Sequence, residues 1–152
     1  MTVAARLAEL GIALPAPSAP LASYVPVVVQ GGLAHVSGQL PFAEDGSLPA
    51  GLVGAGVELA EAQAAARRCA IMILAQLNAA GLLERVERIV KLGVFVASAP
   101  GFSEQHKVAN GASDLLAELL GEAGRHARSA VGVAQLPLGV PVEVDAIVAL
   151  RP

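Results

Sequence analysis

The sequence predicts an α+β sandwich, in which two helices cover one face of a mixed β-sheet in the order β-β-α-β-α-β-β. Three observations predict it. Residues 57–80 repeat apolar side chains at helical spacing, a Gly-Gly pair separates two apolar runs, and residues 86–97 are rich in β-branched side chains. The 152 residues fit a single domain, 1–152, whose first 20 residues form an N-terminal helix and a Pro-rich linker.

The N-terminal part predicts a helix, a linker and a hairpin, in that order. Thr2 can cap a short helix over residues 2–10. The Pro-rich stretch 15–20 predicts an extended linker on the surface. Residues 24–30 and 33–37 predict two strands joined by the Gly-Gly turn.

The middle of the chain predicts a long loop and then the clearest helix. Residues 38–56 hold five glycines and two prolines, and a loop of this length often carries part of a site. Glu58 and Glu61 favour a helix start, and Gly81 ends the helix over residues 57–80. Its apolar positions are Leu59, Ala62, Ala66, Cys69, Ile73 and Leu77.

The last third predicts a central strand, a second helix and two further strands. Gly121 closes the helix, and a Leu-Pro-Leu-Gly turn separates the final two strands. The predicted ranges are 86–97, 102–120, 126–135 and 142–150.

Composition narrows the class of protein. Hydrophobic residues make up 55% and charged residues only 15%, which predicts that part of the surface is buried in a homo-oligomer. The net charge of −3 and the scarcity of aromatic residues disfavour nucleic acid as a partner. No signal peptide or transmembrane segment is visible. The lone Cys69, expected to be a buried small hydrophobe, fits a reducing, cytoplasmic setting.

Motifs for common cofactors and catalytic groups are missing from the sequence. The three histidines, 35, 106 and 126, do not have the spacing of metal ligands, so no metal site is expected. The glycines between positions 51 and 56 predict a loop and not a phosphate-binding turn.

The most informative segment is the strand that begins Arg125-His126-Ala127-Arg128. Alternation places His126, Arg128, Ala130 and Gly132 on one face, so a long cation is followed by two small residues. This pattern leaves space for a carboxylate, which arginine binds with two parallel hydrogen bonds. A salt bridge to a neighbouring subunit would explain the same pattern.

The strand 142–147 provides the second signal, because Glu143 and Asp145 alternate with aliphatic residues and share a face. Two interpretations stay open. The acids form a solvated strand face, or one of them lies near Arg128 and positions a water molecule.

Three segments together resemble the reactive intermediate deaminase family (Rid, or YjgF), whose members often carry the name endoribonuclease L-PSP. Ser37-Gly38-Gln39 resembles its SGQ signature. Residues 127–137, ARSAVGVAQLP, and 142–147, VEVDAI, resemble its two C-terminal strands. The segments Asn110 to Ser113 and Gly124 to Arg128 point to a longer subgroup with an extra N-terminal helix.

The resemblance implies a chorismate-mutase-like fold, a homotrimer with pockets between subunits, and no cofactor. It also implies hydrolysis of reactive 2-imino and 2-enamino acids to 2-keto acids and ammonia. Matched position by position, Arg128 holds the substrate carboxylate and Glu143 orients the attacking water. The positions that match substrate-binding residues of the family are Tyr24, Gly38, Asn110 and Ala130.

One position departs from the family pattern: Ala130 stands where many of its deaminases carry cysteine. Two alternatives to the deaminase therefore stay open. The first is a non-catalytic binder that senses a small carboxylate. The second is an endoribonuclease or translation inhibitor, which the acidic balance disfavours.

Overall fold

The fold is built on one five-stranded sheet, seen here in a computed structural model that describes residues 1–20 and 22–152. The strands of this sheet are β1 (Val27–Gln30), β2 (Leu33–Gln39), β5 (Val86–Ala97), β6 (Ala127–Val133) and β7 (Val142–Leu150). The helices are α1 (Val3–Glu9), α2 (Leu59–Ala79) and α3 (Gln105–Leu120). Short 3-10 turns lie at Leu83–Arg85, Gly121–Gly124 and Pro137–Gly139.

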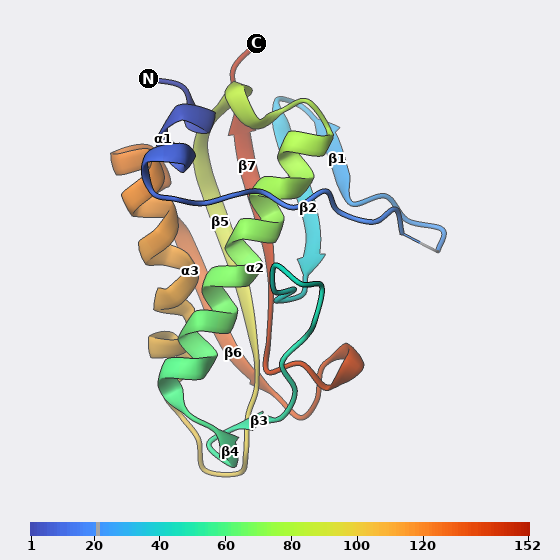
Figure 1. The fold of residues 1–152 in the computed structure, drawn as a ribbon, viewed down its shortest axis with the longest axis vertical. Helices are drawn as coiled ribbons and strands as arrows, with labels where there is room; N and C mark the ends of the chain where they lie inside the picture. The colour runs from blue at the N-terminus through green and yellow to red at the C-terminus, as the bar shows by residue number, and fades with distance from the viewer. Residues whose placement is uncertain (21) are drawn as a thin grey trace.

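The strand order is β1-β2-β7-β5-β6, with β5 and β6 parallel and the other neighbouring pairs antiparallel. Helices α2 and α3 lie on the same face of the sheet (Figure 1). The α+β sandwich with a mixed sheet is therefore confirmed. The strand predicted to be central, β5, is an inner strand, although β7 occupies the middle position.

Two strands have the predicted bounds, whereas other helices and strands begin or end at residues that differ from the predicted ones. Both β5 and β7 have the predicted bounds, whereas β1 begins at Val27 and not at residue 24, because Pro26 has no N–H for a ladder. Helix α3 begins at Gln105 and not at residue 102, because Phe102 closes a turn by donating its N–H to Ala99 O at 3.1 Å.

Two other predicted ranges also change. Strand β6 covers Ala127–Val133 and not residues 126–135, since the side chain of His126 bonds within the preceding turn. The predicted loop 38–56 begins later, because β2 continues to Gln39. It also contains two very short parallel strands, β3 (Leu52–Val53) and β4 (Gly56–Val57).

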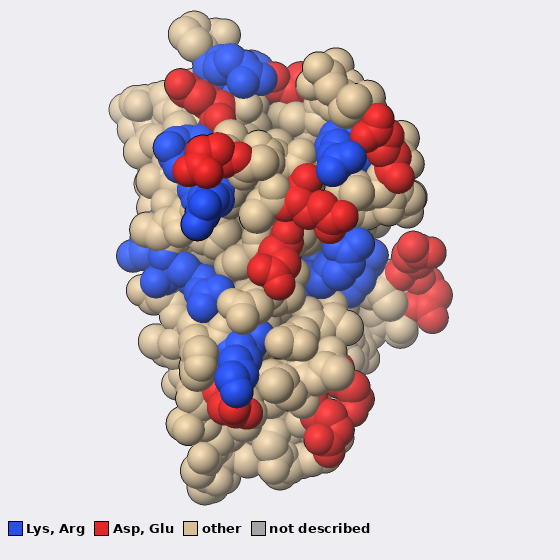
Figure 2. All heavy atoms as spheres, turned by 90° about the vertical axis from the view of Figure 1, so that its left-hand side faces the viewer, with Lys and Arg blue, Asp and Glu red and all other residues tan. Residues whose placement is uncertain are grey.

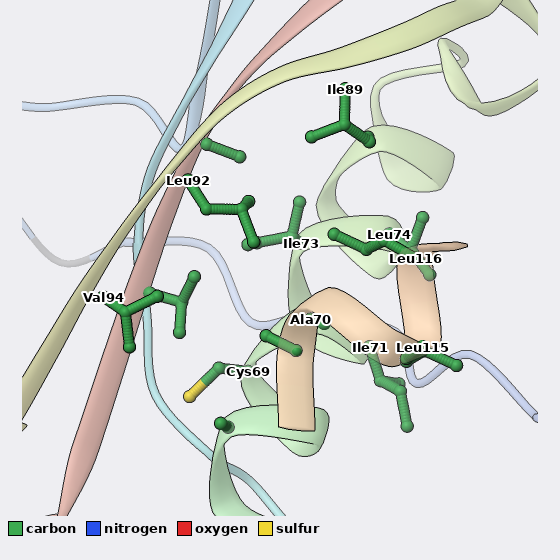
Figure 3. Packing of buried hydrophobic residues seen from close by; sticks show 14 of the residues in the cluster. Cys69, Ala70, Ile71, Ile73, Leu74, Ile89, Leu92, Val94, Leu115 and Leu116 are labelled. Atoms are coloured by element: carbon green, nitrogen blue, oxygen red, sulfur yellow. The ribbon is translucent and has the colours of Figure 1, made fainter. Parts of the chain in front are cut away.

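Helix α2 supplies the largest part of the core. A capping box of Glu58 and Glu61 begins it, and Gly81, at a φ of 71°, follows its end. In Figure 3, Ile73 of this helix lies beside Leu92 of β5, and Leu74 lies beside Leu116 of α3. Cys69 is fully buried in the same core, which confirms the structural prediction, and burial raises the pKa of its thiol well above the usual value.

Helix α1 is a third helix, packed at the side of α3. The carboxylate of Glu84 accepts hydrogen bonds from the backbone N–H groups of Val3 and Ala4, at 2.9 and 2.8 Å, and Thr2 caps the same turn. From α1 the chain crosses the molecule to β1 (Figure 1). Among the described residues, no helix is long and apolar enough to cross a membrane.

Within the described residues, the opposite face of the sheet carries no helix (Figure 1). Val28 and Val131 are exposed there, and Phe95 lies between them on a shallow hollow of the sheet surface. Uncovered β-branched and aromatic side chains on a flat surface are typical of an association surface.

Candidate functional site

Arg128 lies on the helix-covered face of β6, where three groups of α3 hold its guanidinium. Its Nη1 donates to Asn110 Oδ1 and to Ser113 Oγ, both at 3.0 Å, and its Nη2 donates to the backbone carbonyl of His106 at 3.1 Å. Asn110 and Ser113 face Arg128 together because they are three residues apart on a helix.

Part of the guanidinium stays free. In the described part of the chain, the Nε–H and one Nη2 proton of Arg128 have no partner, and no carboxylate forms an ion pair with it. Two free donors on a fixed, permanently charged group match the two oxygens of a carboxylate. A carboxylate of a ligand or of a neighbouring subunit would satisfy both.

His126 extends this network on the same face, as strand alternation predicted. Its Nδ1 donates to the carbonyl of Gly124 at 2.6 Å, and its Nε2 lies 2.9 Å from Ser113 Oγ. Burial lowers the pKa of His126, and the nearby charge of Arg128 lowers it further, against the opposing effect of the Gly124 bond. The ring is therefore neutral at neutral pH, and Nε2 accepts the hydroxyl proton of Ser113.

The residues His106, Asn110, Ser113, His126 and Arg128 are called the arginine cluster below. Ala130 lies two residues along the same strand face and is partly buried against the core. Because β6 is an edge strand, those of its backbone groups that point away from β5 have no strand partner, and they are available to a ligand.

Glu143 lies on the uncovered face of β7, beside Gly38 of the neighbouring strand β2. A Cβ atom at Gly38 would lie 2.9 Å from Cδ of Glu143, so a larger residue at this position would displace the carboxylate from where it lies. Burial raises the pKa of Glu143, and the like charge of Asp145 raises it further. Asp145 itself accepts a hydrogen bond from the Gly93 N–H at 3.0 Å.

Tyr24 and Gly38 line the same cavity, which has a volume of about 850 Å³. The ring of Tyr24 is exposed, and it lies just before β1, at the edge of the sheet. Tyr24, Gly38 and Glu143 are called the glycine–glutamate cluster.

The two clusters lie on opposite faces of the sheet. Arg128 is in register with Leu92, which is buried under the helices, whereas Glu143 is in register with Phe95 on the uncovered face. Strand β5 also separates β6 from β7, which adds about 10 Å between them. The interpretation that an acid of residues 142–147 lies near Arg128 on a neighbouring strand is therefore wrong within one chain.

Sequence reasoning missed two partners of Arg128, namely Ser113 and the carbonyl of His106. A signal for Ser113 existed in its helical spacing from Asn110, but no signal points to a backbone carbonyl. In the described residues, no group of three or more His, Cys, Asp or Glu side chains is placed to hold a metal ion.

The chain is similar to known proteins in both sequence and structure. The family model described as endoribonuclease L-PSP matches residues 15–150. The protein TCP17 of Trypanosoma cruzi is 57% identical over 151 residues, which cover 98% of this chain and 94% of TCP17. A crystal structure of a protein of unknown function from Agrobacterium tumefaciens is 52% identical and has a TM-score of 0.88, over 98% of this chain and 92% of that one.

Two solved structures from Escherichia coli are less similar to this chain in sequence. A crystal structure from Escherichia coli of the YjgF gene product is 31% identical, with a TM-score of 0.64 over 91% of this chain and 94% of that one. TdcF of the same organism, solved with bound serine, is 29% identical, with a TM-score of 0.65 over 90% of this chain and 94% of that one.

Proposed function

The chain belongs to the endoribonuclease L-PSP family, which includes the YjgF and RidA proteins, and we propose that it hydrolyses reactive 2-imino and 2-enamino acids to 2-keto acids and ammonia. The observation that carries this proposal is the guanidinium of Arg128, held by α3 with two donors left free for a carboxylate. The serine bound to TdcF is a 2-amino carboxylate, which is the same arrangement of groups.

The reaction needs a carboxylate anchor and a base. Arg128 fixes the carboxylate, and an enamine takes up a proton at carbon to become the imine. Water then attacks the imine carbon and gives a proton to Glu143, and the electron pair of the C=N bond moves to nitrogen, which takes up that proton. Glu143 next transfers the proton of the new hydroxyl group to nitrogen. The carbon–nitrogen bond breaks as the C=O bond of the keto acid forms, and nitrogen leaves as ammonia. A carboxylate whose pKa is raised by burial is a better proton acceptor near neutral pH than an ordinary glutamate.

The site that we propose lies between two copies of the chain. The arginine cluster and the glycine–glutamate cluster cannot reach one small ligand from the same chain, because the sheet separates them. Arg128, Asn110 and Ala130 of one subunit would face Tyr24, Gly38 and Glu143 of the next. The uncovered apolar face of the sheet supports association, and we infer the homotrimer that the family resemblance implies.

Surface charge supports a small-molecule substrate over RNA. Figure 2 shows acidic and basic side chains interspersed on the side of the molecule that carries α1 and α3. The net charge of −3 and the single tyrosine also disfavour the stacking and phosphate contacts that an endoribonuclease uses.

The test generates 2-aminoacrylate and 2-iminobutyrate in place with a dehydratase and follows their decay by semicarbazone trapping. We expect the wild-type protein to accelerate decay and Arg128→Ala to lose about 100- to 1000-fold in kcat/KM, because two charge-assisted hydrogen bonds disappear. Arg67→Ala, which removes a charge from the surface of α2, is the control.

Two outcomes would change the assignment. Full activity of Arg128→Ala would remove this residue from the site. No acceleration by the wild type, combined with binding of keto acids that depends on Arg128, would make the protein a carboxylate sensor.

A further inference from the structure

The cavity beside Gly38 is larger than a small imino acid needs. Its volume of about 850 Å³ lies in the range of sites for whole small molecules. Its lining includes residues of the Pro-rich segment 15–20 and, from elsewhere in the chain, Phe42, Ala43 and Met72. Segments far apart in the sequence therefore line one space, and Gly38 is part of its lining.

The lining is mainly apolar, and most of its buried polar groups already have partners. Gln39 and Gln76 are only 7% and 8% exposed. Gln76 Nε2 donates to Gln39 Oε1 at 3.2 Å, and Gln39 Nε2 donates to the Ser37 carbonyl at 3.0 Å. Because these amides bond to each other and to the backbone, the walls offer a ligand proline, aromatic and thioether surface, together with the exposed carboxylate of Glu44.

We propose that this cavity binds the substrate side chain and selects 2-imino and 2-keto acids whose side chain is large and apolar, either branched or aromatic. This inference rests on the proposed function, which sets the orientation of the substrate. With the carboxylate on the partner subunit's Arg128 and the imine carbon beside Gly38 and Glu143, the side chain points into the cavity. A methyl group would leave most of the apolar wall in contact with water.

The N-terminal segment has a role in this arrangement. The family model begins at residue 15, so α1 lies outside the residues that it matches. Helix α1 is fixed by Glu84, and Ile12 and Leu14 pack against the core. These contacts fix the chain that leads into the Pro-rich wall.

Calorimetry on the full chain tests the proposal with 4-methyl-2-oxopentanoate and pyruvate, which differ only in the side chain. We expect the larger keto acid to bind at least about tenfold more tightly to the wild type. Ala43→Trp fills the cavity and should remove this preference. Ala64→Trp, at an exposed position of α2 outside the cavity, is the matched control and should retain it.

Equal affinity for the two keto acids, or a preference that survives in Ala43→Trp, would overturn the proposal. Ala16→Trp, in the Pro-rich part of the lining, tests the same space if Ala43→Trp lowers the melting temperature. Hydrolysis of the corresponding imines separates this inference from the proposed function. A binding preference without hydrolysis supports the cavity and rejects the deaminase, whereas equal binding and equal kcat/KM reject the cavity alone.

Discussion

The arginine cluster and the glycine–glutamate cluster differ in how complete each is within one chain. Three groups of α3 hold Arg128, so the cation is positioned before any ligand arrives. Glu143 has no hydrogen-bond donor among the described residues, and its half-buried position beside Asp145 raises the pKa of its carboxyl. Within one chain, the binding group Arg128 is therefore already positioned, whereas the proton acceptor Glu143 lacks a hydrogen-bond donor.

This difference assigns separate tasks to the two regions. A guanidinium held by neutral partners binds without needing to reorient, which favours affinity. A carboxylate that lacks donors keeps its basicity, which favours proton transfer. Changes in the first region should alter binding, and changes in the second should alter turnover.

Glu143→Gln should produce the largest separation between binding and turnover. Losing the base should lower kcat by about 100- to 10,000-fold, while the affinity for keto acids changes little. Imine hydrolysis and calorimetry measured on the same sample check this. Glu87→Gln, at an exposed position of β5, is the control. A loss of affinity as large as the loss of kcat would show that Glu143 binds the ligand directly.

Mixing two inactive variants tests whether the clusters meet across an interface. Trimers assembled from equal amounts of Arg128→Ala and Glu143→Gln should regain about a quarter of the wild-type activity, since a site then needs one intact residue from each neighbour. Differently tagged subunits confirm that mixed trimers form. Mixed trimers without activity would mean that Arg128 and Glu143 of neighbouring subunits do not form one site.

Ser113→Ala should weaken the anchor without affecting turnover. The variant loses one acceptor of Arg128 and the donor to His126, so keto-acid affinity should fall about fivefold, or by about 1 kcal/mol. Calorimetry measures the change, with exposed Ser103→Ala as the control. An unchanged affinity would mean that Asn110 and the His106 carbonyl hold the guanidinium alone.

Asp145→Asn should give the smallest effect, a shift in pH dependence. Because the carboxylate form of Glu143 is the base, kcat falls as the pH falls through its raised pKa. Removing the neighbouring charge lowers that pKa, so the acid side of the profile should move to lower pH. The amide oxygen of asparagine can still accept the Gly93 N–H. A shift toward higher pH would contradict the assignment.

Stability should change in the same variant with a defined sign. A raised carboxyl pKa means that the folded chain binds a proton more readily than the unfolded chain. The contribution of Glu143 to stability therefore decreases as the pH rises from its ordinary pKa through its raised pKa. Thermal unfolding across this range should be less dependent on pH in Asp145→Asn than in the wild type.

Sequence patterns predicted the helices and strands better than they predicted on which faces of the sheet the two clusters lie. The alternation of β7 and the β-branched content of β5 are local, so both strands have their predicted bounds. Alternation also placed His126 and Arg128 on one face. It could not show that Glu143 faces the other way, because the relative phase of two strands depends on register and strand order.

The candidate residues were predicted from a resemblance of motifs. The residues that they contact could be identified only in the three-dimensional structure. The asparagine of the arginine cluster was expected, but its contact with Arg128 depends on how α3 packs over β6. The Pro-rich stretch 15–20 was predicted as an extended surface linker, and its course along a cavity depends on where the core holds Leu14.

Tyr24 gives the unmodified protein a built-in optical probe. It is the only tyrosine, and the chain contains no tryptophan. Its ring is 56% exposed and lies on the wall of the cavity beside Gly38. Almost all intrinsic ultraviolet emission therefore originates from one position at the candidate site. Ligand entry, or closure by a second subunit, would change the polarity around a single emitter, so both events can be followed in real time without a label.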